Sequence, residues 1–188
     1  MNHTDLSQST FDNKPKFKLG VVVNPFAGIG GALALKGSDG AEIREKALAM
    51  GAEKKANEKM AKALSILEAL SGQFTVVTAS GDMGETICES LGIPYEVIYA
   101  ADAVQTEGED SERAAKAMVD ANVDLLLFAG GDGTARNICS VVGTQVPVLS
   151  DIQLYLMTCL LWCAITEPEA CTPGLLQVCY ASLEMSLV

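Results

Sequence analysis

Residues 123–134 read Val-Asp-Leu-Leu-Leu-Phe-Ala-Gly-Gly-Asp-Gly-Thr, and this stretch decides the fold. Its apolar first half predicts a strand at 123–128 that is buried on both faces. Its second half, 129–134, places glycines around one carboxylate and predicts a tight loop leading into a helix. Strands that are apolar on both faces are typical of parallel sheets covered by helices, so we expect an α/β fold.

The rest of the chain alternates strand and helix on either side of this stretch. Apolar and β-branched segments predict further strands at 17–23, 73–78, 95–99 and 146–149. Helix-favouring composition predicts a short and a longer helix within 41–70, and helices at 82–91, 111–121 and 135–142. This alternation predicts a doubly wound parallel sheet with helices on both faces.

Composition excludes several classes of protein. Hydrophobic residues make up 49% of the 188 residues, which excludes a disordered chain. The 13 Lys and Arg against 24 Asp and Glu give a formal net charge of −11, which disfavours nucleic acid and anionic membranes as partners. The single histidine, His3, argues against His-based triads and metal sites, and no metal-ligating residues are predicted. Residues 1–19 lack the apolar core of a secretory signal, so we expect a cytoplasmic protein.

A change in composition divides the chain into three parts. Residues 1–16 form a polar arm, 17–149 the α/β domain, and 150–188 an apolar tail that has no Lys or Arg and is rich in cysteine. Its uncharged run 152–166 is short for a membrane span, and we expect a buried helix there, with a span or a poorly packed tail as alternatives. The six cysteines show no C-x-x-C spacing and are interpreted as reduced thiols.

A first glycine loop follows the strand at 17–23. Residues 24–31 read Asn-Pro-Phe-Ala-Gly-Ile-Gly-Gly and contain Gly28, Gly30 and Gly31. The third glycine of a dinucleotide fingerprint is replaced by Leu33, and the lysine of a P-loop is absent. The loop is therefore interpreted as an anion-binding nest of backbone N–H groups, or as a tight turn that needs positive φ.

The second glycine loop carries the candidate acid–base group. Gly130, Gly131 and Gly133 let the backbone lie flat against a ligand, and Asp132 stands at the carboxyl edge of the sheet. A carboxylate so placed can act as a general base toward a hydroxyl, hold Mg²⁺ through water, or cap a helix. Thr134 is expected to cap the following helix or to donate its hydroxyl to a phosphate.

Gly-Gly-Asp-Gly-Thr at 130–134 after an apolar strand resembles the signature of the NAD kinase and diacylglycerol kinase superfamily. The segments 24–31, 35–40 (Leu-Lys-Gly-Ser-Asp-Gly) and 81–85 (Gly-Asp-Met-Gly-Glu) are similar to its ATP-NAD kinase branch. The resemblance covers roughly residues 17–149, and its motifs follow the predicted strands in the order of that branch.

The resemblance implies ATP-dependent phosphorylation of the 2′-hydroxyl of NAD to give NADP. It assigns Asp132 as the catalytic residue, with ATP and Mg²⁺ as cofactors and NAD as the acceptor. Small-molecule nucleotides are then the partners, and a homo-oligomer is expected. Lys36 and Arg136 are the cations beside a loop. The implied nucleotide-binding residues are Asn24, Gly28, Gly30, Gly31, Gly130, Gly131, Gly133 and Thr134.

The sequence departs from the family after residue 149. Members of the superfamily place a second, β-rich domain there, and the residues after Thr134 are too few for it. We interpret 150–188 as the product of a truncation or a reading-frame change, and expect this short chain to be weakly active or inactive. Two alternatives stay open: a kinase of lipids or sphingoid bases, and a non-catalytic nucleotide-binding module.

Overall fold

The computed structural model describes residues 16–29, 45–46, 48–51, 54–70, 72–101 and 106–150. Its strands are β1 (Phe17–Val23), β2 (Phe74–Ala79), β3 (Tyr95–Tyr99), β4 (Leu125–Ala129) and β5 (Val148–Ser150). Its helices are α2 (Lys55–Ser65), α3 (Glu85–Leu91), α4 (Gly108–Asp120) and α5 (Asp132–Val142), with 3-10 turns η2 (Glu68–Leu70) and η3 (Gly81–Met83). Residues 1–15 of the predicted arm (1–16) and residues 151–188 of the predicted tail (150–188) lie outside the described residues.

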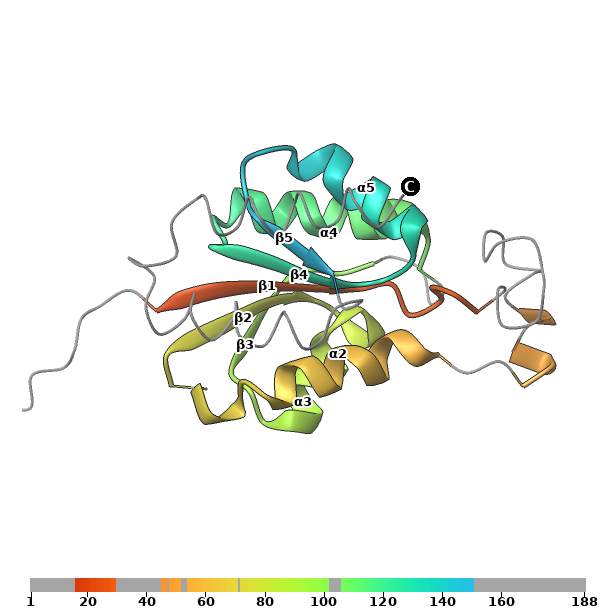
Figure 1. The fold of residues 1–188 in the computed structure, drawn as a ribbon, viewed down its shortest axis with the longest axis horizontal. Helices are drawn as coiled ribbons and strands as arrows, with labels where there is room; N and C mark the ends of the chain where they lie inside the picture. The colour runs from red at the N-terminus through yellow and green to blue at the C-terminus, as the bar shows by residue number, and fades with distance from the viewer. Residues whose placement is uncertain are drawn as a thin grey trace, which may run out of the picture.

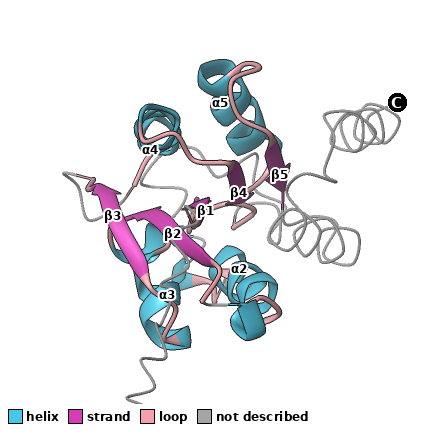
Figure 2. Ribbon diagram, turned by 90° about the vertical axis from the view of Figure 1, so that its left-hand side faces the viewer, coloured by secondary structure: helices cyan, strands magenta, loops and turns pink. Residues whose placement is uncertain are grey.

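The sheet is parallel throughout, as predicted. Its five strands lie in the order β3-β2-β1-β4-β5, with β1 in the centre between β2 and β4. Helices α2 and α3 cover one face and α4 and α5 cover the other, which Figures 1 and 2 show from two directions. The structure is therefore the doubly wound α/β sandwich that the alternation of apolar strands and helices predicts.

Two apolar layers, one on each face of the sheet, form the core. On the first face, Met60 and Leu64 of α2 and Ile87 of α3 pack against the sheet and are 0–5% exposed. On the second face, α4 and α5 contribute a matching set of buried side chains to the other layer: Ala114, Ala115, Met118, Ile138 and Val142. All five residues of β4 are buried, so this strand is apolar on both sides because both sides are covered.

Three helices begin at different residues from those predicted. Helix α5 begins at Asp132, because the backbone of Gly131 is extended and serves as its N-cap. Helix α4 begins at Gly108, because Glu107 and Asp110 form a capping box that the sequence analysis did not identify. The segment predicted as one helix at 82–91 is split into η3 and α3, because Gly84 adopts φ +147°.

Two cysteines lie within the described residues, and they differ in environment. Cys88 of α3 is fully buried and Cys139 of α5 is exposed. Desolvation raises the pKa of the Cys88 thiol to about 11, so it stays protonated and unreactive near neutral pH. A free, protonated Cys88 agrees with the interpretation of the cysteines as reduced thiols. None of the helices within the described residues is both long and apolar enough to cross a membrane.

Candidate functional site

The two glycine loops flank the point where the strand order of the sheet reverses. From β1 the chain builds outward to β2 and β3 on one side, and β4 and β5 are then added on the other side. The loops after β1 and β4 therefore diverge at the carboxyl edge between two adjacent strands. In open α/β sheets this switch point is where ligands bind. The sheet topology thus places both predicted loops at the expected position of a binding site.

Asn24 joins the two loops. Its backbone N–H donates to the carbonyl of Ala129 at 2.9 Å, and its side-chain Nδ2 donates to Thr134 Oγ1 at 3.0 Å. Its Oδ1 accepts the N–H of Phe26 at 3.1 Å, which turns the chain after Pro25. Each polar group of the Asn24 side chain is therefore engaged within the protein. The hydrogen bonds give Asn24 and Thr134 a role in holding the first loop against the second.

Asp132 lies at the first position of α5 with an exposed carboxylate. The side chain is 66% exposed and forms an ion pair with Arg136, one turn further along the helix. A carboxylate in the first helical turn is stabilised by the positive end of the helix dipole. Thr134 lies inside α5, whose N-cap is Gly131, so Thr134 is not the helix cap, which corrects that part of the prediction. Asp132 thus reaches solvent at the carboxyl edge of the sheet, as predicted.

Two glycines of the loops are required by the fold, each for a different structural reason. Gly28 has φ +75°, a conformation that favours glycine. A Cβ atom on Gly130 would lie 2.5 Å from the Cβ of Thr134, so the packing of Thr134 requires glycine there. The fold explains these two. Gly30 and Gly31 lie outside the described residues.

Gly133 has no such reason within the described residues, whereas Gly131 is the N-cap of α5, a position that favours glycine over alanine. Neither has positive φ, and a Cβ atom built on either meets no other atom within 4 Å. At position 133, inside α5, glycine destabilises the helix relative to alanine by roughly 0.5–1 kcal/mol. Both positions therefore leave open space beside the Asp132 backbone, and at Gly133 this space comes at a cost in stability.

Lys54 is a residue of this edge that the sequence analysis missed. It is the N-cap residue of α2, and its ammonium lies 4.6 Å from the ring centroid of Phe26 and 3.1 Å from Asp82 Oδ2. Of the two predicted cations, Lys36 is outside the described residues and Arg136 pairs with Asp132. The position of Lys54 at the start of a helix could have indicated this residue. A helix that packs on a parallel sheet begins at the carboxyl edge of the sheet, so a cation at the start of the helix lies near the loops.

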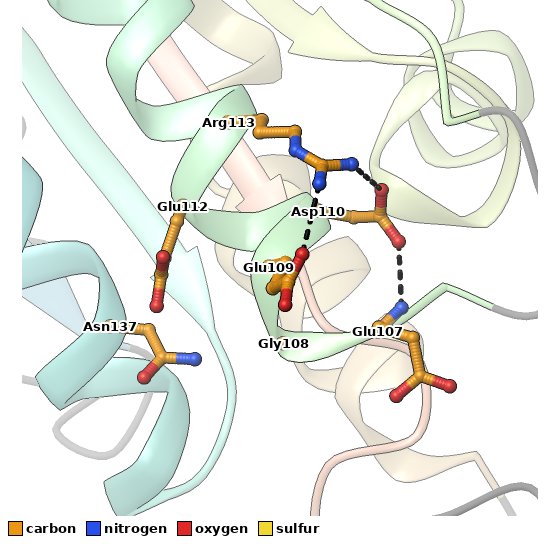
Figure 3. A pocket seen from close by; sticks show the side chains of 7 residues that line it. All are labelled: Glu107, Gly108, Glu109, Asp110, Glu112, Arg113 and Asn137. Carbon is orange, nitrogen blue, oxygen red and sulfur yellow. Dashed lines mark hydrogen bonds and ion pairs between the residues drawn. The ribbon is translucent and has the colours of Figure 1, made fainter.

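A separate pocket opens beside the start of α4, and its charge makes it unsuitable for phosphate. It has a volume of about 530 Å³ and is lined by the carboxylates of Glu107, Glu109, Asp110 and Glu112, with Arg113 and Asn137 (Figure 3). Arg113 pairs with Glu109 and Asp110, so its charge is already neutralised. An excess of carboxylates repels a polyphosphate, and the glycine loops remain the candidate site.

Within the described residues no group of three or more His, Cys, Asp or Glu side chains could hold a metal ion. Mg²⁺ is commonly bound by one or two carboxylates together with water and substrate phosphates. The donor set here fits that manner of binding, in which the nucleotide supplies most of the ligands. It does not fit a metal site built by the protein alone.

A parallel α/β sheet with two glycine loops joined across its switch point is typical of α/β proteins that bind phosphate-containing ligands. Sequence comparison identifies the family. The profile of the ATP-NAD kinase N-terminal domain matches residues 19–150, so the chain belongs to the ATP-NAD kinase family. The resemblance inferred from the glycine loops is therefore confirmed at the level of the family and of the fold.

One curated protein matches a shorter part of the chain. Over 96 residues the chain is 35% identical to the UDP-N-acetylmuramoylalanine--D-glutamate ligase of Deinococcus radiodurans. The match covers 51% of this chain and 19% of the ligase, so the chain spans less than a fifth of the length of that relative. No solved structure matches the chain significantly. The family assignment therefore rests on the domain match.

Proposed function

We propose that the protein is an NAD kinase-like phosphotransferase that transfers the γ-phosphoryl group of ATP to the 2′-hydroxyl of NAD, giving NADP and ADP. The family supports kinase chemistry and nucleotide binding in general. The choice of ATP as donor and NAD as acceptor is the part that is proposed. The same family membership makes the lipid kinase a less favoured alternative.

The observation that carries the proposal is the bare backbone on both sides of Asp132. Gly131 and Gly133 leave space that no atom of the described protein fills. A ribose or phosphate group that approaches this backbone closely explains why side chains are absent there. A protein that needed only the fold would gain stability from alanine at position 133, inside the first turn of α5.

Each residue of the site receives a role in this proposal. Asp132 accepts the proton of the 2′-hydroxyl while that oxygen attacks the γ-phosphorus, and the bond from the γ-phosphorus to the bridging oxygen of ADP breaks. The backbone at Gly131 and Gly133 contacts the nucleotide. Asn24 and Thr134 keep the loops together, so that donor and acceptor meet in one orientation.

Mg²⁺ is proposed to enter with ATP and to neutralise phosphate charge when bound. The formal net charge of −11 makes that neutralisation important, because the chain as a whole repels polyphosphates. The phosphates of ATP are its proposed main ligands.

The direct test is turnover by the 188-residue chain. The purified protein is mixed with MgATP and NAD, and NADP is measured with an NADP-specific dehydrogenase. Formation of NADP supports the proposal. If ATP binds but no NADP forms, the chain acts as a nucleotide-binding module. If a lipid offered in place of NAD is phosphorylated, the chain is a lipid kinase.

We expect Gly133→Ala to stabilise the fold and to weaken nucleotide binding. The free energy of unfolding should rise by about 0.5–1 kcal/mol, because alanine favours the helix. The affinity for ATP or NAD should fall by about 10- to 100-fold, because the methyl group occupies the space of the ligand. Urea denaturation and calorimetric titration measure the two effects.

Gly130→Ala is the matched control for this prediction. It adds the same methyl group, but against Thr134, so it should destabilise the protein before any ligand is added. If Gly133→Ala binds both nucleotides as tightly as the wild type, the space beside Asp132 is not a ligand site.

A further inference from the structure

Lys54 lies where three segments of the carboxyl edge converge. It begins α2, its ammonium is above Phe26 of the first glycine loop, and it pairs with Asp82 of the loop after β2. Asn57, one turn into α2, donates to the carbonyl of Asp82 at 2.8 Å. The start of α2 is thus attached to both loops. Figure 1 shows α2 beginning at the end of the sheet where β1 finishes.

The stability of the helix does not explain a lysine at this position. The N-cap position favours Ser, Thr, Asp or Asn, and Lys54 makes no side-chain capping hydrogen bond. A cation at the start of a helix also opposes the helix dipole. The ion pair with Asp82 is partly exposed, at 36% and 50% for the two side chains, and such pairs contribute little to stability.

The chemistry of the site supplies a reason. A nucleotide brings several negative charges to a chain whose formal net charge is −11. Arg136, the other cation that the structure places near the loops, pairs with the proposed proton acceptor Asp132, whereas Asp82, the partner of Lys54, has no proposed role in the chemistry. Lysine is a common phosphate ligand, because its charge is compact and its stem is flexible. Contact with Phe26 orients that stem toward the first glycine loop.

We propose that Lys54 is a phosphate-binding residue of the nucleotide site, held ready by Phe26 and Asp82. When the nucleotide binds, the ammonium exchanges the exposed Asp82 carboxylate for a phosphate oxygen and keeps its place above Phe26. This inference rests on the proposed function. The shared chemistry is a nucleotide phosphate, from the triphosphate of ATP or from the pyrophosphate of NAD.

The test compares Lys54→Met with wild type in calorimetric titrations of MgATP, NAD and adenosine. Methionine keeps an apolar stem against Phe26 and removes the charge. We expect the affinity for one of the two phosphorylated ligands to fall by about 10- to 100-fold, with the binding of adenosine unchanged. The ligand that loses affinity identifies the source of the phosphate. Lys54→Arg should restore part of the loss, because it restores the charge.

Two further variants provide controls. Lys55→Met removes the neighbouring exposed charge and should leave both affinities near the wild-type value. Asp82→Asn removes the competing carboxylate and should strengthen binding of the same phosphorylated ligand that Lys54→Met weakens.

The outcomes separate this inference from the proposed function. If the wild type binds nucleotides and Lys54→Met binds them equally well, the role of Lys54 is overturned and the proposed function stands. Equal losses for adenosine and for the phosphorylated ligands would show a structural role and would also overturn it. If the wild type binds neither ATP nor NAD, both proposals fall.

Discussion

Replacing Asp132 by Asn should lower the rate of NADP formation by about 100-fold or more, with little change in nucleotide affinity. The amide keeps the shape of the side chain but cannot accept the proton of the attacking hydroxyl. Stability should change little, because the carboxylate and its partner Arg136 are both largely exposed. Turnover and nucleotide titration on the same preparations measure the two effects.

Arg136→Gln is the control for this experiment. It removes the same ion pair and leaves the Asp132 carboxylate in place, so it should keep most of the wild-type rate. Equal losses in the two variants would show that the ion pair matters and the proton acceptor does not. Retention of full activity by Asp132→Asn would leave Asp132 as a residue of the helix start, without a role in the chemistry.

The sequence predicts the sheet well because both faces of each central strand are buried. The strands β1 and β3 begin and end at the predicted residues, and β4 (Leu125–Ala129) begins two residues later and ends one residue later than the strand predicted at 123–128. Gly92 adopts φ +64° at the C-cap of α3, a left-handed conformation in which glycine commonly ends a helix. Burial of a strand and reversal of the chain each depend on a few neighbouring residues. The sequence of those residues therefore predicts them without knowledge of the rest of the fold.

The starts of the helices and the cation near the site could not be predicted in the same way. Composition predicts a start at residue 135, because glycine disfavours a helix. In the structure α5 begins at Asp132 and includes Gly133, because the extended backbone of Gly131 provides the N-cap. Lys54 is 28 residues from Asp82 in the chain, and only the packing of α2 on the sheet brings them together. Long-range pairs of this kind depend on the complete topology.

The glycines of the site illustrate the same distinction. A glycine motif indicates a loop, but it does not say whether the fold or a ligand requires each glycine. Gly130 is explained by the packing of Thr134 and Gly131 by its position at the N-cap of α5, whereas the fold gives no reason for Gly133. Within one motif, the structure therefore separates glycines whose replacement should change the stability of the fold from a glycine whose replacement should change nucleotide binding.

Gly84, between η3 and α3, is a further glycine that the fold itself requires. Its φ of +147° is unfavourable for any residue with a side chain, and a Cβ atom there would overlap Thr78 Oγ1. That hydroxyl cannot move away freely, because it is buried and donates to the carbonyl of Val21 at 2.9 Å. A methyl group on Gly84 therefore strains the backbone and breaks a contact between β1 and β2.

We expect Gly84→Ala to lower the free energy of unfolding by about 3–5 kcal/mol, a large part of the stability of a domain. Gly92→Ala is the matched control: its φ is also positive but its Cβ meets nothing within 4 Å, so it should cost only about 1–2 kcal/mol. Urea denaturation measures both. Thr78→Ala removes the overlapping hydroxyl, so the double variant should be less destabilised than the sum of the single variants. Additive losses would show that the backbone conformation alone requires Gly84, since relief of the overlap would then contribute nothing.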